Sequence, residues 1–141
     1  MKKSLLLFLV LCTGIISYAQ CNKKLILNSS KTEYLDSSKT VKRTVDENSV
    51  IELTNAELII TPGGEDNRMS GPVKSTSCNW KIPFKEGKTV VKATLTDPGG
   101  DSKNVTITIE GKEGKLTLLA EVDDDPNHKI RVAIDKFEEK T

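Results

Sequence analysis

The sequence predicts an all-β domain of about eight antiparallel strands in an up-and-down order that closes into a barrel. Short runs of β-branched residues and leucines are separated by turn residues at intervals of about ten. The loops between these runs are short, which favours antiparallel neighbours. Aliphatic residues alternate with threonine, lysine and glutamate, as expected for a sheet with one buried face. A two-sheet β-sandwich would give the same pattern and is the alternative.

The amino-terminal half of the domain supplies the first expected runs. Leu25–Leu27 opens the domain and is followed by a polar stretch from Asn28 to Asp36. Asn55 and Ala56 form the predicted turn of a hairpin. The other runs in this half are Val41–Val45, Val50–Leu53 and Leu58–Thr61. The sequence Pro62-Gly63-Gly64 then breaks the chain, because proline lacks a ladder donor and glycine permits a positive φ.

The carboxy-terminal half shows the clearest alternation. Val105, Ile107 and Ile109 alternate with threonines, which gives the cleanest two-residue period in the chain. Residues 135–141 are read as a charged tail. The remaining expected strands and the turns between them are Met69–Lys81, Val90–Leu95, the turn Asp97–Asp101, the hairpin loop Gly111–Gly114, Leu116–Val122, the turn Asp123–Asn127 and Ile130–Ile134.

Residues 1–19 have the three zones of a secretory signal peptide. Lys2 and Lys3 precede the apolar run Leu5–Ile16, and Ser17-Tyr18-Ala19 predicts cleavage between Ala19 and Gln20. The run is short for a membrane span, and no second run follows. We therefore expect a single β domain over residues 20–141, exported to the periplasm or the cell exterior and without a transmembrane segment. Lipidation of Cys21 is the alternative form of processing.

Composition argues against several function classes. Without Lys2 and Lys3 the chain has 19 basic and 20 acidic residues, so no long-range attraction to nucleic acid or to anionic membranes is expected. The mature chain has only four aromatic residues, which is few for a platform that stacks bases or sugars. Those four are Tyr34, Trp80, Phe84 and Phe137.

Two cysteines, Cys21 and Cys78, stay in the mature chain. In an oxidising compartment they predict one disulfide, which would stabilise the fold by roughly 4 kcal/mol on the chain-entropy model. Two unpaired thiols, or a lipidated Cys21, are the alternatives. A cysteine-based metal site is not expected, because no further cysteine is present and His128 is remote in sequence.

The segment Asp123–His128 holds the densest group of hard ligands. Three adjacent carboxylates could supply part of a calcium site, but the spacing of a calcium-binding loop is absent. A solvated acidic turn is the simpler interpretation, and we expect no metal and no cofactor. His128 is the only histidine. No nucleophilic residue accompanies it in a recognisable catalytic motif, so we do not expect the protein to be an enzyme. A hydrolase built on His128 and scattered acids is the least favoured hypothesis.

Trp80 and Tyr34 are the candidate ligand-binding residues. Trp80, followed by Pro83 and Phe84, is read first as a plug in the core at one end of the sheet. The functional alternative has Trp80 or Tyr34 lining a ligand cavity. Tryptophan fluorescence that responds to apolar ligands would favour the second interpretation.

The signal peptide, the domain length and the opening segment Leu25–Tyr34 together resemble bacterial lipocalin-like proteins. These often begin with a leucine-asparagine strand followed by lysine and an aromatic residue, as at Leu27, Asn28, Lys31 and Tyr34 here. The glycine-x-tryptophan that opens many lipocalin barrels is missing, and the tryptophan stands at Trp80. The resemblance implies a small β-barrel that binds or carries a small hydrophobic molecule. The alternative function is an accessory or interaction module of the cell envelope.

Overall fold

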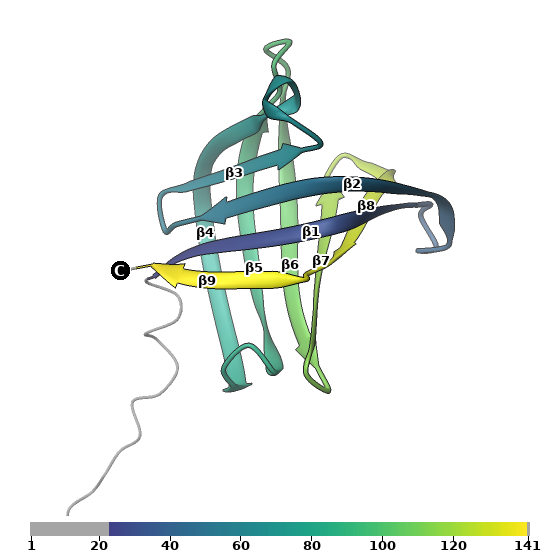
Figure 1. Cartoon of the computed structure of the whole chain (residues 1–141). Helices are drawn as coiled ribbons and strands as arrows, with labels where there is room; N and C mark the ends of the chain where they lie inside the picture. The colour runs from purple at the N-terminus through teal and green to yellow at the C-terminus, as the bar shows by residue number, and fades with distance from the viewer. Residues whose placement is uncertain (1–22, 141) are drawn as a thin grey trace, which may run out of the picture.

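The computed structural model describes residues 23–140, and nine strands and one short 3-10 helix account for most of them (Figure 1). No α-helix occurs in this range, and nothing in it is a helix long and apolar enough to cross a membrane. The elements are β1 (Lys24–Leu35), β2 (Val41–Leu53), β3 (Glu57–Pro62), η2 (Glu65–Asn67), β4 (Met69–Ile82), β5 (Glu86–Thr96), β6 (Ser102–Lys112), β7 (Lys115–Val122), β8 (Asp125–Ala133) and β9 (Lys136–Lys140).

All nine strands belong to one antiparallel sheet. Each strand from β1 to β7 pairs with the next along the chain, and β1 pairs with both β2 and β8, which closes a ring of eight strands. The prediction of an all-β, antiparallel, up-and-down fold is confirmed, and the sheet is single rather than a two-sheet sandwich. The ninth strand pairs with β1 and makes the ring irregular.

The irregularity lies along β1. Its carboxy-terminal part, Thr32–Leu35, pairs with β8, whereas Lys24–Asn28 pairs with β9 on the same side. Between the two parts, the Asp135 carboxylate accepts hydrogen bonds from the Ser30 amide at 2.8 Å and the Ser30 hydroxyl at 2.6 Å. Strand β8 pairs with β7. After β8 the chain no longer follows β7, and it pairs with the first half of β1 as β9.

Two expectations for this region were wrong. The polar stretch Asn28–Asp36 belongs to β1 up to Leu35, and the charged tail 135–141 contains β9. Polar residues are compatible with a strand here because the edge of β9 faces solvent, where charged side chains are common. The runs Val41–Val45 and Val50–Leu53 also form one continuous strand, β2.

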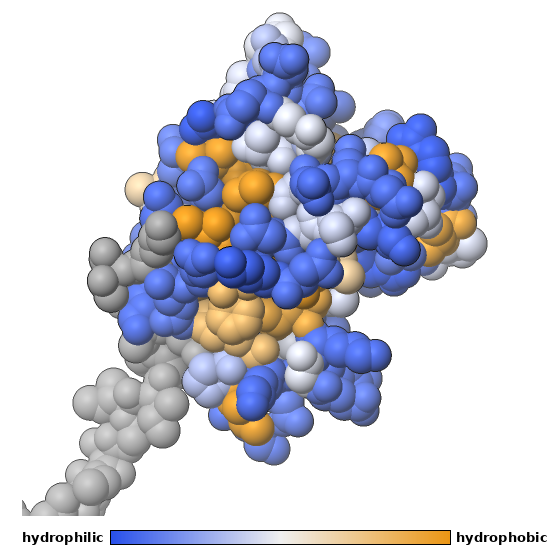
Figure 2. Space-filling view, in the orientation of Figure 1, coloured by the Kyte–Doolittle hydropathy of each residue, from blue (hydrophilic) through white to orange (hydrophobic). Residues whose placement is uncertain are grey.

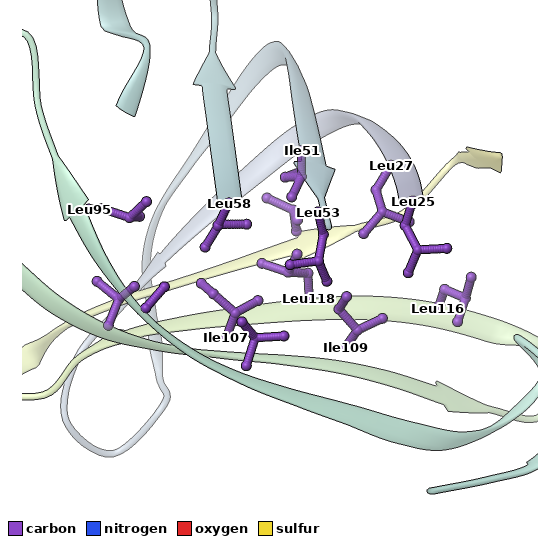
Figure 3. Close-up of a cluster of buried hydrophobic side chains, with 14 of the residues drawn as sticks. Leu25, Leu27, Ile51, Leu53, Leu58, Leu95, Ile107, Ile109, Leu116 and Leu118 are labelled. Atoms are coloured by element: carbon purple, nitrogen blue, oxygen red, sulfur yellow. The ribbon is translucent and has the colours of Figure 1, made fainter. Parts of the chain in front are cut away.

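The core follows from the alternation of each strand. Val105, Ile107 and Ile109 of β6 point inward and are at most 6% exposed, while the threonines between them face outward. Leucines and isoleucines from opposite walls of the ring point toward one another (Figure 3). Each fully buried side chain of this size stabilises the fold by roughly 1.5–3 kcal/mol.

Aromatic side chains fill one end of the ring. Trp80 is 6% exposed, and its ring centroid lies 5.6 Å from that of Phe84 in the turn between β4 and β5. The ring centroid of Phe84 in turn lies 4.4 Å from that of Phe137 of β9. These contacts join β9 to a part of the ring with which it shares no strand pairing. Phe137 stays 38% exposed, and Figure 2 shows apolar surface on this face among hydrophilic residues.

Two glycines make room for the Trp80 ring. A Cβ at Gly111 would lie 2.7 Å from Trp80 Cζ3, and one at Gly87 would lie 3.0 Å from Trp80 Cδ2 and 2.5 Å from Trp80 Cα. Gly87 also has a φ of 145°, which L side chains rarely adopt. The indole nitrogen donates a hydrogen bond to Thr89 Oγ1 at 2.7 Å. The core therefore accommodates the Trp80 ring and satisfies the hydrogen-bond donor of its indole nitrogen.

A candidate ligand-binding cavity

The other end of the ring encloses a cavity of about 310 Å³. All eight ring strands contribute to its wall, near the turns β1–β2, β3–β4, β5–β6 and β7–β8. Three of the four aromatic residues within 23–140 lie at the opposite end, and aliphatic side chains line the space without filling it. They include Ile51, Met69, Leu95, Ile107, Ala120 and Ile130, from six different strands.

Three polar atoms of the cavity wall have no partner. Thr32 Oγ1, Glu47 Oε1 and Ser49 Oγ are buried and form no hydrogen bond within residues 23–140. Thr32 is 3% exposed and Ser49 is 4% exposed. A buried polar group without a partner typically costs about 1–3 kcal/mol, so such groups are uncommon in native proteins. All three lie on the neighbouring strands β1 and β2, which gives the apolar cavity one polar wall.

A β-bulge lies beside Glu47, which continues the inward alternation of Ile51 and Ser49 on β2. Ser29 pairs with Ser49, but the next pair is Lys31 with Asp46, so Glu47 and Asn48 lie opposite Ser30 alone. Bulges bend a strand and redirect a side chain, and they are frequent beside functional sites. The inward phase of β1 changes at the same point, from Ser29 to Thr32.

The hydroxyl of Ser29 provides an internal comparison. It is as buried as that of Ser49, but it donates a hydrogen bond to the Lys31 carbonyl at 3.0 Å. Ser29 does not line the cavity. Burial alone therefore does not explain the missing hydrogen bonds of Thr32, Glu47 and Ser49, which all line the cavity.

The mouth of the cavity carries more acidic than basic groups. Asp97 and Asp101 come from the turn between β5 and β6, where the Asp97 carboxylate accepts a hydrogen bond from the Asp101 amide at 3.0 Å. Glu121 is neutralised by Lys129, whose Nζ lies 2.7 Å from its carboxylate. Among the residues that the structure describes, Lys103 is the one lysine that lines the cavity.

The acidic turn Asp123–His128 lies beside this mouth. His128 lines the cavity, and its Nδ1 contacts the Asp125 carboxylate. This contact lowers the pKa of Asp125 below its ordinary value of 3.8, with a smaller contribution from the Asn127 amide. Asp123 instead accepts a hydrogen bond from Thr106 at 2.7 Å. Within the described residues, no three carboxylates, histidines or cysteines are grouped as a metal site.

The two candidate aromatic residues lie at opposite ends of the ring. Tyr34 lines the cavity, with the Arg43 guanidinium 4.4 Å from its ring centroid. Trp80 belongs to the aromatic end and does not line the cavity. A ligand-binding role stays a prediction for both. Sequence reasoning missed Thr32, Glu47 and Ser49, although Glu47 and Ser49 continue the two-residue alternation of Ile51 and Leu53.

The amino-terminal predictions lie outside the described residues. They are the signal peptide, its cleavage site and the state of Cys21. Cys78 lies on β4, where its sulfur is 3.5 Å from Thr89 Oγ1. Lys23 and Cys78 line the same small depression, so the described chain begins close to this cysteine. The disulfide between Cys21 and Cys78 stays a prediction.

No family model, curated protein or solved structure matches this chain. The resemblance to lipocalin-like proteins therefore stays an expectation that rests on the residues Leu25–Tyr34.

Proposed function

We propose that this is a non-enzymatic binding protein that holds a small apolar molecule inside the ring. The supporting observation is the cavity itself, with its aliphatic lining and its enclosure by eight strands. Ligand sites generally have volumes of about 300–1,000 Å³ and are mostly apolar with a few polar groups. A cavity of about 310 Å³ is at the lower end of this range, so the ligand is small.

The protein would meet its ligand outside the cytoplasm, because residues 1–19 have the pattern of a secretory signal peptide. A carrier role suits that location. Apolar molecules dissolve poorly in water, and burial in an aliphatic cavity removes their surface from it.

The test is isothermal titration calorimetry of the mature chain with octanol, octylamine and octanoate. At least one of the three should bind saturably, with one site per chain. Ala120→Leu should weaken binding by about ten-fold or more, because the larger side chain occupies part of the cavity.

Ala133→Leu is the matched control. Ala133 is exposed on β8 and does not line the cavity, so this variant should bind as the wild type does. If none of the three compounds binds, the ligand-binding function is wrong. The alternative, an interaction module of the cell envelope, would then be the function to test.

A further inference from the structure

We propose that the ligand has a positively charged head group that donates hydrogen bonds, of which a primary amine is the simplest, and that Glu47, Ser49 and Thr32 receive it. This inference rests on the proposed binding function and specifies its ligand class.

The polar wall of the cavity has a defined hydrogen-bonding capacity. An ionised carboxylate only accepts hydrogen bonds, whereas a hydroxyl both donates and accepts. Glu47 Oε1 is buried without a partner, and the two neighbouring hydroxyls are equally unpartnered. A head group that satisfies all three must supply at least one donor to Glu47. An ammonium group has three donors in a compact arrangement, one for each of these oxygens.

The charge of the polar wall also favours a cation. Within residues 23–140 Glu47 forms no ion pair, although seven other pairs occur there. A second anion beside this carboxylate would be repelled strongly, because the apolar surroundings screen charge poorly. A carboxylate head group is therefore disfavoured at this wall. An ammonium would form a charge-assisted hydrogen bond, which is stronger than one from a neutral hydroxyl.

The two carboxylate oxygens of Glu47 have different surroundings. The Oε1 atom is buried in the cavity wall, while Oε2 lies beside Gly63 in the loop after β3, where an added Cβ would be 3.2 Å away. Glu47 is therefore held between the cavity and the β3–β4 turn. Asp97 and Asp101 add negative charge at the mouth, which attracts a cation toward the cavity.

These groups also define how a ligand would lie. The polar wall is formed by β1 and β2, and aliphatic residues such as Leu95, Ile107 and Ala120 come from β5, β6 and β7. A short amphiphile would place its head against Glu47 and its alkyl chain against these residues. Burial of the chain would provide affinity, and the head group would provide specificity.

The test compares octylamine, octanol and octanoate by isothermal titration calorimetry at neutral pH. We expect octylamine to bind about ten-fold or more tightly than either other compound, as one charge-assisted hydrogen bond would provide. Glu47→Gln should abolish this preference, because an amide keeps the size of the side chain but removes its charge. Binding of octanol should change little.

Glu52→Gln is the matched control on the same strand. Glu52 is half-buried, does not line the cavity, and pairs with Lys24 at 3.8 Å. This variant should keep the full preference for octylamine. Circular dichroism spectra should show that both variants fold.

The outcomes separate this inference from the proposed function. If none of the three compounds binds, the binding function itself is wrong. If octanol or octanoate binds as tightly as octylamine, or if Glu47→Gln keeps the preference, the cavity binds ligands but the head-group inference is wrong.

Discussion

The carboxylate of Asp135 accepts two hydrogen bonds from Ser30, one from the amide and one from the hydroxyl. Ser30 is the single β1 residue opposite the bulge of β2, and Asp135 lies where the chain passes from β8 to β9. One contact therefore joins the point where the ring becomes irregular to the bulge that carries Glu47. The fold and the polar wall of the cavity are connected through this pair.

Removing the Asp135 carboxylate should loosen β9. Asp135→Ala should lower the free energy of unfolding by about 1–2 kcal/mol, because two hydrogen bonds to a charged but exposed group are lost. Urea denaturation measures this change, and amide exchange should become faster in Lys136–Lys140. Asp124→Ala, in the exposed turn before β8, is the control and should leave both unchanged. Unchanged exchange in Asp135→Ala would show that the Ser30 contact does not hold β9.

Ser49 and Ser29 should respond differently to the same substitution. Ser49→Ala should leave the free energy of unfolding unchanged or raise it, because the removed hydroxyl has no partner in the protein. Ser29→Ala should lower it by about 1 kcal/mol, because its hydrogen bond to the Lys31 carbonyl is lost. Thermal and urea unfolding measure both variants. Equal losses in the two would contradict the assignment of Ser49 to an unsatisfied cavity wall.

Gly111 should tolerate no larger side chain. Gly111→Ala should lower the free energy of unfolding by about 1–3 kcal/mol, because the new methyl would overlap with Trp80 and with the Lys85 backbone. The emission of Trp80 should shift as its packing changes. Gly64→Ala is the control, since Gly64 has an extended backbone and no atom within 4 Å of an added Cβ. Similar stability of the two variants would mean that the Trp80 end is loosely packed.

The Asp125–His128 pair should be visible in a pH titration. The folded protein holds the pKa of Asp125 below 3.8, so this group stabilises the fold above that pH. The contribution is lost as the pH falls through the lowered folded value. His128→Ala should return the pKa toward its ordinary range, as followed by carboxyl chemical shifts in NMR spectra. A folded pKa that stays low in His128→Ala would assign the shift to the Asn127 amide instead.

The alternation of side chains made most of the fold predictable. Val105, Ile107 and Ile109 identify an inward face without reference to other strands, and short turns order the strands as a meander. The second half of β1 was missed because its inward residue Thr32 is polar, and the cavity accepts polar groups that a packed core would not. The ninth strand was missed because it is charged and short, as edge strands often are.

The candidate site was only partly predictable. Tyr34 could be proposed as a cavity residue because large aromatic side chains are rare in this chain. Glu47 was missed because the sequence does not show that this part of the sheet borders a space. It continues the inward alternation of Ile51 and Ser49, but a carboxylate is not expected in a packed core. The space itself depends on the placement of Trp80, Phe84 and Phe137 at the opposite end.

Methyl NMR spectroscopy tests most directly whether small amphiphiles enter the ring at its non-aromatic end. On titration with octylamine, the methyl signals of Ile107 and Ile130, which line the cavity, should shift saturably. The signal of Ile82, which is 44% exposed near the aromatic end, should stay in place. Shifts confined to Ile82, or no saturable shift at Ile107 and Ile130, would contradict the account.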